Sequence, residues 1–231
     1  MPRNQSTSSS YPADSESETD LKDARKQARK VSHTLAKTYP DADCALIHRN
    51  PFELTVATIL SAQCTDKMVN KVTPALFARY PGPQAMAAAD PKELEDLIHP
   101  TGFFRAKAKN LIGMSQGLVE RFDGQVPRRL EDLTSLPGVG RKTAHVVLGV
   151  AFGIPSGVVV DTHVKRLAYR LGLTDAHDPE RVERDLVRAL PRSHWIAFSH
   201  RMITLGREVC GSARPQCERC PLTKICPKRL D

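Results

Sequence analysis

The sequence predicts an all-α protein. Nearly every segment between positions 21 and 210 combines helical spacing of apolar residues with a local start or stop signal. The only strand-like run is Val158-Val159-Val160, which is too short and too isolated to build a sheet. No internal repeat is apparent. About ten helices are therefore expected.

The first 20 residues form a segment of their own. They are rich in serine and acidic residues and almost devoid of apolar ones, which predicts a disordered tail over 1–20. This segment lacks the apolar core of a signal peptide and the arginine content of a transit peptide. No apolar run in the chain is long enough to span a bilayer. A soluble protein without a membrane partner is expected.

The next two helices begin with different signals. Residues 21–39 form a basic amphipathic stretch that ends before a proline. In the following segment Asn50 can cap a helix and Pro51 suits its first position. Glu53 stands where a capping box places an acidic residue.

The remaining helices follow from similar signals. We expect Asp66 to cap a helix that runs to Tyr80, and Asp90 to cap the helix after it. Further helices are expected over 105–122, 130–136 and 140–152, after Asp161, after Asp178, and over 194–210. The Pro and Gly residues of 153–157 mark the expected boundary between two helical lobes.

The charge of the chain is unevenly distributed. The net charge is +8, but the tail carries one arginine against four acidic residues, so residues 21–231 carry +11. A basic globular body favours a polyanionic partner, above all nucleic acid. The alternative is a soluble protein that is merely basic, and charge alone does not decide between them.

Four of the six cysteines lie in the last 22 residues. They are Cys210, Cys217, Cys220 and Cys226. In a reducing compartment such a cluster indicates a metal centre rather than disulfides, and a thiolate set suits zinc or an iron–sulfur cluster. The spacing leaves these two open. A redox pair formed by Cys217 and Cys220 alone is disfavoured by the flanking cysteines, and a structural role is expected.

The stretch LPGVGRKTAHVV, residues 136–147, places a Gly-x-Gly turn directly before a helix. Such a turn presents free backbone N–H groups at the positive end of the helix dipole, where they can bind an anion. With the short helix before it, the turn makes a helix-hairpin-helix that would hold a DNA phosphate whatever the base. A plain turn between two helices is the alternative, and the Arg141-Lys142 pair favours DNA.

Lys142 and Asp161 are the candidate catalytic residues. An amine that is partly desolvated at a helix N-terminus is more often neutral, so Lys142 could attack a carbon and form a Schiff base. The alternative is a solvated lysine that touches phosphate. Asp161 could accept a proton from Lys142 or stabilise a cationic sugar, or it could only cap the helix that follows.

Taken together, these motifs resemble the endonuclease III family of helix-hairpin-helix DNA glycosylases over about residues 25–228. The stretches LSAQCTD (60–66), LPGVGRKTAHVV and VDTHVKR (160–166) and the cysteine spacing follow the order of the family. The resemblance implies a six-helix barrel over 44–154 that carries the hairpin. A second lobe, 21–43 plus 155–231, would hold a [4Fe–4S] cluster on Cys210, Cys217, Cys220 and Cys226, and DNA would lie in the cleft between the lobes.

The resemblance also implies an activity. The family excises oxidised pyrimidines from double-stranded DNA and then nicks the abasic strand. Lys142 matches its Schiff-base lysine and Asp161 its catalytic aspartate, while Gln63 and Phe103 would fill the gap left by the extruded base. The residues expected to hold the DNA backbone are Pro137, Gly138, Val139, Gly140 and Arg141. A monomer in the cytoplasm of a bacterial-type cell, associated with the nucleoid, is expected.

Two departures from the family lie at or next to the expected wedge residues. The wedge at Phe103 is often aliphatic, and Cys64 stands where alanine is common. One rival function is a monofunctional mismatch glycosylase of the same superfamily, which would lack a lysine at the position of Lys142. The other is a non-catalytic DNA clamp, which gives no reason for Lys142 and Asp161 together.

Overall fold

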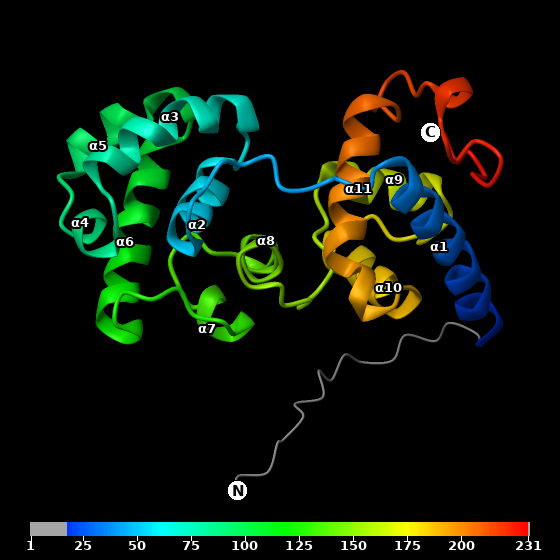
Figure 1. Cartoon of the computed structure of the whole chain (residues 1–231), viewed down its shortest axis with the longest axis horizontal. Helices are drawn as coiled ribbons and strands as arrows, with labels where there is room; N and C mark the ends of the chain where they lie inside the picture. The colour runs from blue at the N-terminus through cyan, green and yellow to red at the C-terminus, as the bar shows by residue number, and fades with distance from the viewer. Residues whose placement is uncertain (1–17, 231) are drawn as a thin grey trace, which may run out of the picture.

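The computed structural model describes residues 18–230, with side chains from residue 21 onward. The tail predicted for 1–20 thus lies outside the described residues, apart from the backbone of 18–20. Every regular element in the described part of the chain is helical, and one isolated bridge joins Cys210 and Pro215. The all-α prediction is confirmed (Figure 1). None of the helices within 18–230 is long and apolar enough to cross a membrane.

The described chain forms eleven α-helices and three short 3₁₀ turns. The helices are α1 (Glu18–Thr38), α2 (Pro51–Leu60), α3 (Asp66–Arg79), α4 (Pro83–Ala87), α5 (Pro91–Ile98), α6 (Phe104–Phe122), α7 (Leu130–Thr134), α8 (Arg141–Phe152), α9 (Thr162–Arg170), α10 (Pro179–Ala189) and α11 (Trp195–Glu208). Only α4 has no counterpart among the predicted helices.

Cap chemistry explains most of the helix starts. The side chains of Asn50 and Asp90 each accept a hydrogen bond from the backbone N–H three residues later, at 2.9 Å, as predicted. The predicted cap at Asp66 is wrong. Thr65 caps α3, and Asp66 is the first helical residue, where its carboxylate pairs with Arg207 of α11 at 2.7 Å.

Glu53 differs from its predicted role in the capping box. Its carboxylate accepts from the backbone N–H and from the guanidinium of Arg49, rather than from the N–H of the cap residue Asn50. The ion pair between Arg49, which precedes the cap residue, and Glu53 therefore stabilises the start of α2. Glu53 is 2% exposed.

Buried apolar side chains gather in two clusters. The first draws on residues 46–159 and the second on residues 28–35 and 158–222. Figure 1 shows the same division: α2 to α8 lie on one side, and α1 lies with α9, α10 and α11 on the other. The N-terminal helix α1 packs against α10 and α11, so the second cluster is built from both ends of the chain.

An extended segment passes between the two clusters. Val158 belongs to the second cluster and Val159 to the first, because successive side chains of an extended chain point to opposite sides. The N–H of Val159 donates to Ser199 Oγ of α11 at 3.0 Å. The strand-like run of the sequence is thus a connector between two cores, and it ends at Asp161.

Candidate functional site

The hairpin between α7 and α8 packs tightly against α6. An added Cβ at Gly117 would lie 2.8 Å from Leu136, and one at Gly113 would lie 3.2 Å from Pro137. These two glycines therefore let the hairpin approach the α6 backbone. Gly138 has φ +75°, and a Cβ there would lie 2.7 Å from the Cβ of Asn110. Only glycine fits this turn without strain.

The hairpin presents its backbone rather than its side chains. Pro137, Gly138 and Gly140 are exposed, whereas the side chain of Val139 is 3% exposed. Gly140 occupies the N-cap of α8 and has no side chain with which to cap it. The N–H groups of the first turn of α8 thus face a position where an external anion can accept them.

Lys142 lies in the first turn of α8 and its side chain is exposed. The sequence led us to expect partial desolvation, and the protein does not supply it. Any desolvation of the amine would therefore have to come from a bound ligand. The position itself is as predicted, because the lysine directly follows the hairpin at the positive end of a helix.

Arg141 belongs to a polar cluster that joins α8 to α10. Its Nη2 lies 3.1 Å from Glu183 Oε1, and His145 Nε2 lies 2.9 Å from the same oxygen. On its other side the ring of His145 meets Ser156 Oγ at 2.7 Å through Nδ1. Burial alone would raise the pKa of Glu183, but its contacts with His145 and Arg141 lower it below the ordinary value. We call Arg141, His145, Ser156 and Glu183 the α8–α10 polar cluster.

Asp161 is the N-cap of α9. Its Oδ1 accepts a hydrogen bond from the N–H of Val164 at 2.8 Å, and the residue is half-buried. The capping role is thus established. Among the interactions of the described residues, none joins Asp161 to Lys142 directly. The two candidate catalytic residues sit at the starts of two different helices, each held by a different connector.

Helix α9 also reaches the cysteine-rich segment. Arg166 donates to the carbonyl oxygens of Gly206 and Cys210, at 3.1 and 2.8 Å. Arg170 donates to those of Gly211 and Ser212, at 2.7 and 2.8 Å. One helix therefore carries Asp161 at its start and supports the cysteine loop with its middle and end.

Cys210, Cys217, Cys220 and Cys226 line a single pocket. Its other walls include Leu167, Leu205 and Val209. Burial raises the pKa of the thiols of Cys220 and Cys226, and the neighbouring cysteines raise it further. Within residues 18–230, no three metal-ligating side chains converge closely enough to hold one ion.

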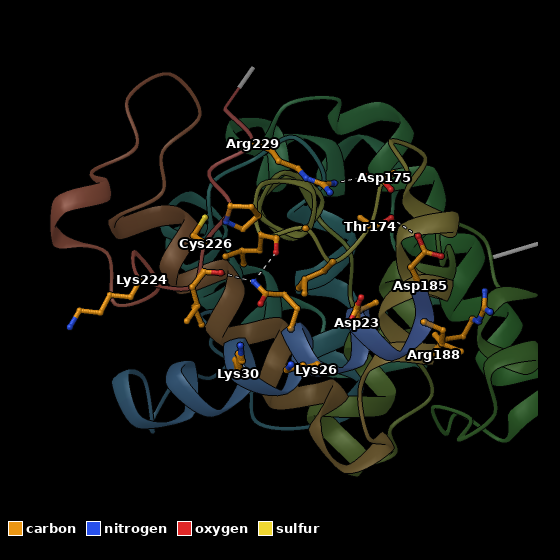
Figure 2. A pocket seen from close by; sticks show the side chains of 18 residues that line it. Asp23, Lys26, Lys30, Thr174, Asp175, Asp185, Arg188, Lys224, Cys226 and Arg229 are labelled. Carbon is orange, nitrogen blue, oxygen red and sulfur yellow. Dashed lines mark hydrogen bonds and ion pairs between the residues drawn. The ribbon is translucent and has the colours of Figure 1, made fainter. Parts of the chain in front are cut away.

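A groove next to the cysteine pocket lies between α1 and the C-terminal segment (Figure 2). Gln27 of α1 bridges it by donating to the carbonyl oxygens of Leu171 and Ile225, at 3.1 and 2.7 Å. Cys226 lines both the groove and the cysteine pocket. Side chains of both signs line the groove, three aspartates among five lysines and arginines.

Gln63 and Phe103 share an unusual geometry. Both are non-glycine residues with positive φ, +52° and +48°, and both are exposed. Phe103, which is 66% exposed, is no core aromatic. A left-handed conformation at such residues costs about 1–3 kcal/mol and persists mostly at functional sites.

Comparison with known proteins identifies the family. Residues 56–192 match the HhH-GPD superfamily of base excision DNA repair proteins. Endonuclease III of Synechocystis sp. is 56% identical over 203 residues, which cover 88% of this chain and 93% of the relative. The chain belongs to the endonuclease III family. Endonuclease III of Bacillus subtilis is 47% identical over 81% of this chain and 86% of its own.

Solved structures agree with this membership. An endonuclease III trapped as a covalent intermediate with DNA superposes with a TM-score of 0.84 at 46% identity, covering 88% of this chain and 96% of that one. A non-covalent endonuclease III–DNA complex gives the same TM-score of 0.84 at 45% identity, covering 88% and 95%. A thermostable thymine-DNA glycosylase has a TM-score of 0.78 at 20% identity, covering 88% and 96%, which shows a shared fold alone.

Sequence reasoning missed several residues that shape this endonuclease III family site. His145 and Glu183 each lie in an amphipathic helix, and nothing in their local pattern indicated a contact between them. Arg166 and Arg170 gave no signal beyond a basic helix. Lys107 of α6, which is only 4% exposed, was also missed, because a lysine within a helical pattern is normally a surface residue.

Proposed function

We propose that this chain is a bifunctional DNA glycosylase and AP lyase that excises oxidised pyrimidines in base excision repair. The observation that carries the proposal is the position of Lys142. It is an exposed amine on the helix turn that directly follows a backbone anion site, in a chain that belongs to the endonuclease III family. A phosphate held by the hairpin would bring the neighbouring deoxyribose to this amine.

The chemistry follows from an amine placed at the sugar. The damaged nucleotide leaves the stack, since its C1′ cannot be reached inside the duplex. Lys142 Nζ attacks C1′, the bond to the base breaks, and the base departs with the bonding electrons and takes up a proton. Opening of the sugar ring leaves a protonated imine. Loss of a proton from C2′ then expels the 3′ phosphate and nicks the strand by β-elimination.

Asp161 has a different part in this reaction. Lys142 must lose a proton to become a nucleophile, and a carboxylate on the neighbouring helix start can accept it. The same carboxylate stabilises positive charge that develops on the sugar. Its hydrogen bond from Val164 N fixes the carboxylate on a rigid helix start, which supports this role.

Gln63 and Phe103 are proposed to fill the space left by the extruded nucleotide. Two exposed side chains held in left-handed conformations fit this role. An apolar wedge between base steps is a known means of holding kinked DNA. The hairpin residues 137–141 would hold the backbone, with Val139 and Arg141 acting chiefly through their main chain because their side chains are engaged in the protein.

A [4Fe–4S] cluster on Cys210, Cys217, Cys220 and Cys226 is proposed as a structural cofactor. Four thiols around one pocket suit a [4Fe–4S] cluster, which is held by four cysteine thiolates. Cationic iron would also offset the unfavourable crowding of thiolates in a buried pocket. Bound there, the cluster cross-links the C-terminal segment and thereby supports α9.

The proposal also covers the two lobes, the DNA partner, the oligomeric state and the location in the cell. The two apolar clusters are proposed to be the cores of two lobes, 44–154 and 21–43 plus 155–231, with double-stranded DNA across the cleft between them. A monomer that acts on damaged pyrimidines and abasic sites, in the bacterial cytoplasm at the nucleoid, is proposed. The body's charge of +11 supports a DNA partner.

Borohydride trapping tests the function. It reduces the imine, so the wild-type protein should form a covalent complex with a duplex that contains an oxidised pyrimidine, but not with an undamaged one. Lys142→Ala should abolish the complex, whereas Lys92→Ala, at an exposed lysine of α5, should leave it unchanged. Base release without any trapped complex would instead indicate a monofunctional glycosylase, and binding without release would indicate a clamp.

A further inference from the structure

One buried cation lies beneath the two loops that carry Gln63 and Phe103. Lys107, near the start of α6, is only 4% exposed. Its Nζ donates to the carbonyl oxygens of Leu60 and Thr101, each at 2.8 Å. Leu60 ends α2 just before the loop of Gln63, and Thr101 ends the turn just before Phe103. A single ammonium group thus joins the bases of both loops.

Lys107 also holds Phe103 through its main chain. Its backbone N–H donates to the carbonyl oxygen of Phe103 at 3.1 Å. The side chain and the main chain of one residue therefore bind the carbonyls on either side of Gly102, whose φ of +69° begins the turn into Phe103. Two successive residues with positive φ, Gly102 and Phe103, are thus flanked by hydrogen bonds to the same lysine.

Packing alone does not explain a lysine at this site. Burial of a charged amine is unfavourable, and it lowers the pKa of Lys107 below the ordinary value. Methionine would fill the same space without that cost. Both hydrogen-bond acceptors of the amine within the described residues are uncharged carbonyls, and the nearby thiol of Cys64 offsets the effect of burial on its pKa only in part. What lysine adds over methionine is a strong donor that reaches two loops at once.

The residues above Lys107 need such support. Gln63 and Phe103 are forty positions apart in the sequence, exposed, and in a conformation that relaxes unless its surroundings hold it. Each loop could hold its own residue by local hydrogen bonds. A contact shared by both loops adds a direct constraint on the spacing between the two, beyond the packing of α2 against α6.

We propose that Lys107 is a positioning residue for base extrusion, which sets the spacing between Gln63 and Phe103 so that both side chains enter the duplex together at the damaged nucleotide. This inference rests on the proposed function, because both residues act there in the space left by the extruded nucleotide. Lys107 itself touches neither DNA nor the reacting atoms.

The test compares two substrates in single-turnover reactions of the full chain. A duplex with an oxidised pyrimidine requires base extrusion, whereas a single-stranded oligonucleotide with an abasic site requires only the lyase chemistry. Lys107→Met should lower the rate on the duplex by about 10- to 100-fold, the effect expected of a misplacement of about 1 Å, and leave the single-strand rate near that of the wild type. Lys92→Met, at an exposed lysine of α5, should change neither.

The ratio of the two rates is measured within one preparation, so a partly unfolded variant does not change it. A fall in both rates by the same factor would overturn the proposal, because it would show that Lys107 supports only the fold. If wild-type protein cleaves neither substrate, the proposed function fails instead, and the two failures are thus distinguishable.

A double-mutant cycle gives a second and independent readout. Once Phe103 is truncated, its position no longer matters, so Lys107→Met should add much less to the loss on the duplex in a Phe103→Ala background than it does in the wild type. Effects that simply multiply would contradict a role through Phe103.

Discussion

Replacing Glu183 by glutamine should loosen the joint between α8 and α10. One oxygen of this carboxylate contacts Arg141 at 3.1 Å and His145 at 2.9 Å, and the side chain is 10% exposed. Glutamine keeps the shape and loses the charge. Each contact then falls from a charge-assisted interaction to a neutral one, a loss of about 1 kcal/mol, so the free energy of unfolding should fall by about 2 kcal/mol.

Thermal unfolding measures this loss. A change of 1 kcal/mol shifts the Tm of a protein of this size by about 2–4 °C, so Glu183→Gln should lower the Tm by about 4–8 °C at pH 7. Glu183→Ala removes the carboxylate from both contacts at once and should cost about 3–5 kcal/mol. Glu120→Gln, at an exposed carboxylate of α6, is the control and should stay within about 0.5 kcal/mol of the wild type.

The pH dependence of the Tm shows whether the charge of Glu183 stabilises the fold. The pKa of Glu183 is lowered in the folded chain, so its stabilising effect is complete above the unfolded value of about 4.3 and is lost as the pH falls through the folded value. Glutamine does not titrate. The Tm difference between wild type and Glu183→Gln should therefore shrink below about pH 4. Equal Tm values at pH 7, or a constant difference down to low pH, would refute the reasoning.

Three further outcomes are expected. Asp161→Asn should keep the Tm of the wild type, because asparagine caps as well as aspartate, but it should lose most of the turnover. Asp161→Ala should lose the turnover and also about 1 kcal/mol of stability. An Asp161→Asn variant with wild-type activity would show that Asp161 is only a helix cap. Cys220→Ser should lower the iron content below the wild-type value of about four per chain, measured by elemental analysis, and a zinc-loaded wild type would contradict the cluster. Gly138→Ala should weaken DNA binding about tenfold in a fluorescence titration, because the added Cβ would clash with Asn110 in a left-handed turn. In the Gly140→Ala variant the added Cβ meets no atom within 4 Å, so the stability of the protein should be unchanged.

Local chemistry explains what the sequence could predict of the fold. Helix starts at Asn50, Asp90 and Asp178 follow from side chains that bond to their own first turns, so residues a few positions apart contain the signal. Helix α4 was missed because it has five residues, offers one buried side chain, Met86, and depends on packing against α6. The cap of α3 was placed at Asp66 in error because Thr65, directly before it, is also a favoured cap residue, and Asp66 instead pairs with the distant Arg207.

The residues of the candidate site likewise divide into those that local sequence could predict and those that depend on the three-dimensional packing. The hairpin and Lys142 could be located because the turn needs glycines at fixed positions in the sequence. The environment of Lys142 could not be predicted, since its exposure depends on how the helices pack. Lys107 carried no signal at all, because its acceptors are main-chain carbonyls, which every residue possesses. Its role depends on the three-dimensional arrangement alone.

The arrangement of the two apolar clusters also constrains the order of folding. The first cluster is contiguous, from residue 46 to residue 159, and can close soon after that stretch leaves the ribosome. Helix α1 emerges first but finds its partners only in α10 and α11, near the far end of the chain. Closing so long a loop is slow and entropically unfavourable. We therefore expect α1 to dock last. In the newly made chain the first cluster, with the hairpin between α7 and α8, would be folded while α1 has not yet packed against α10 and α11.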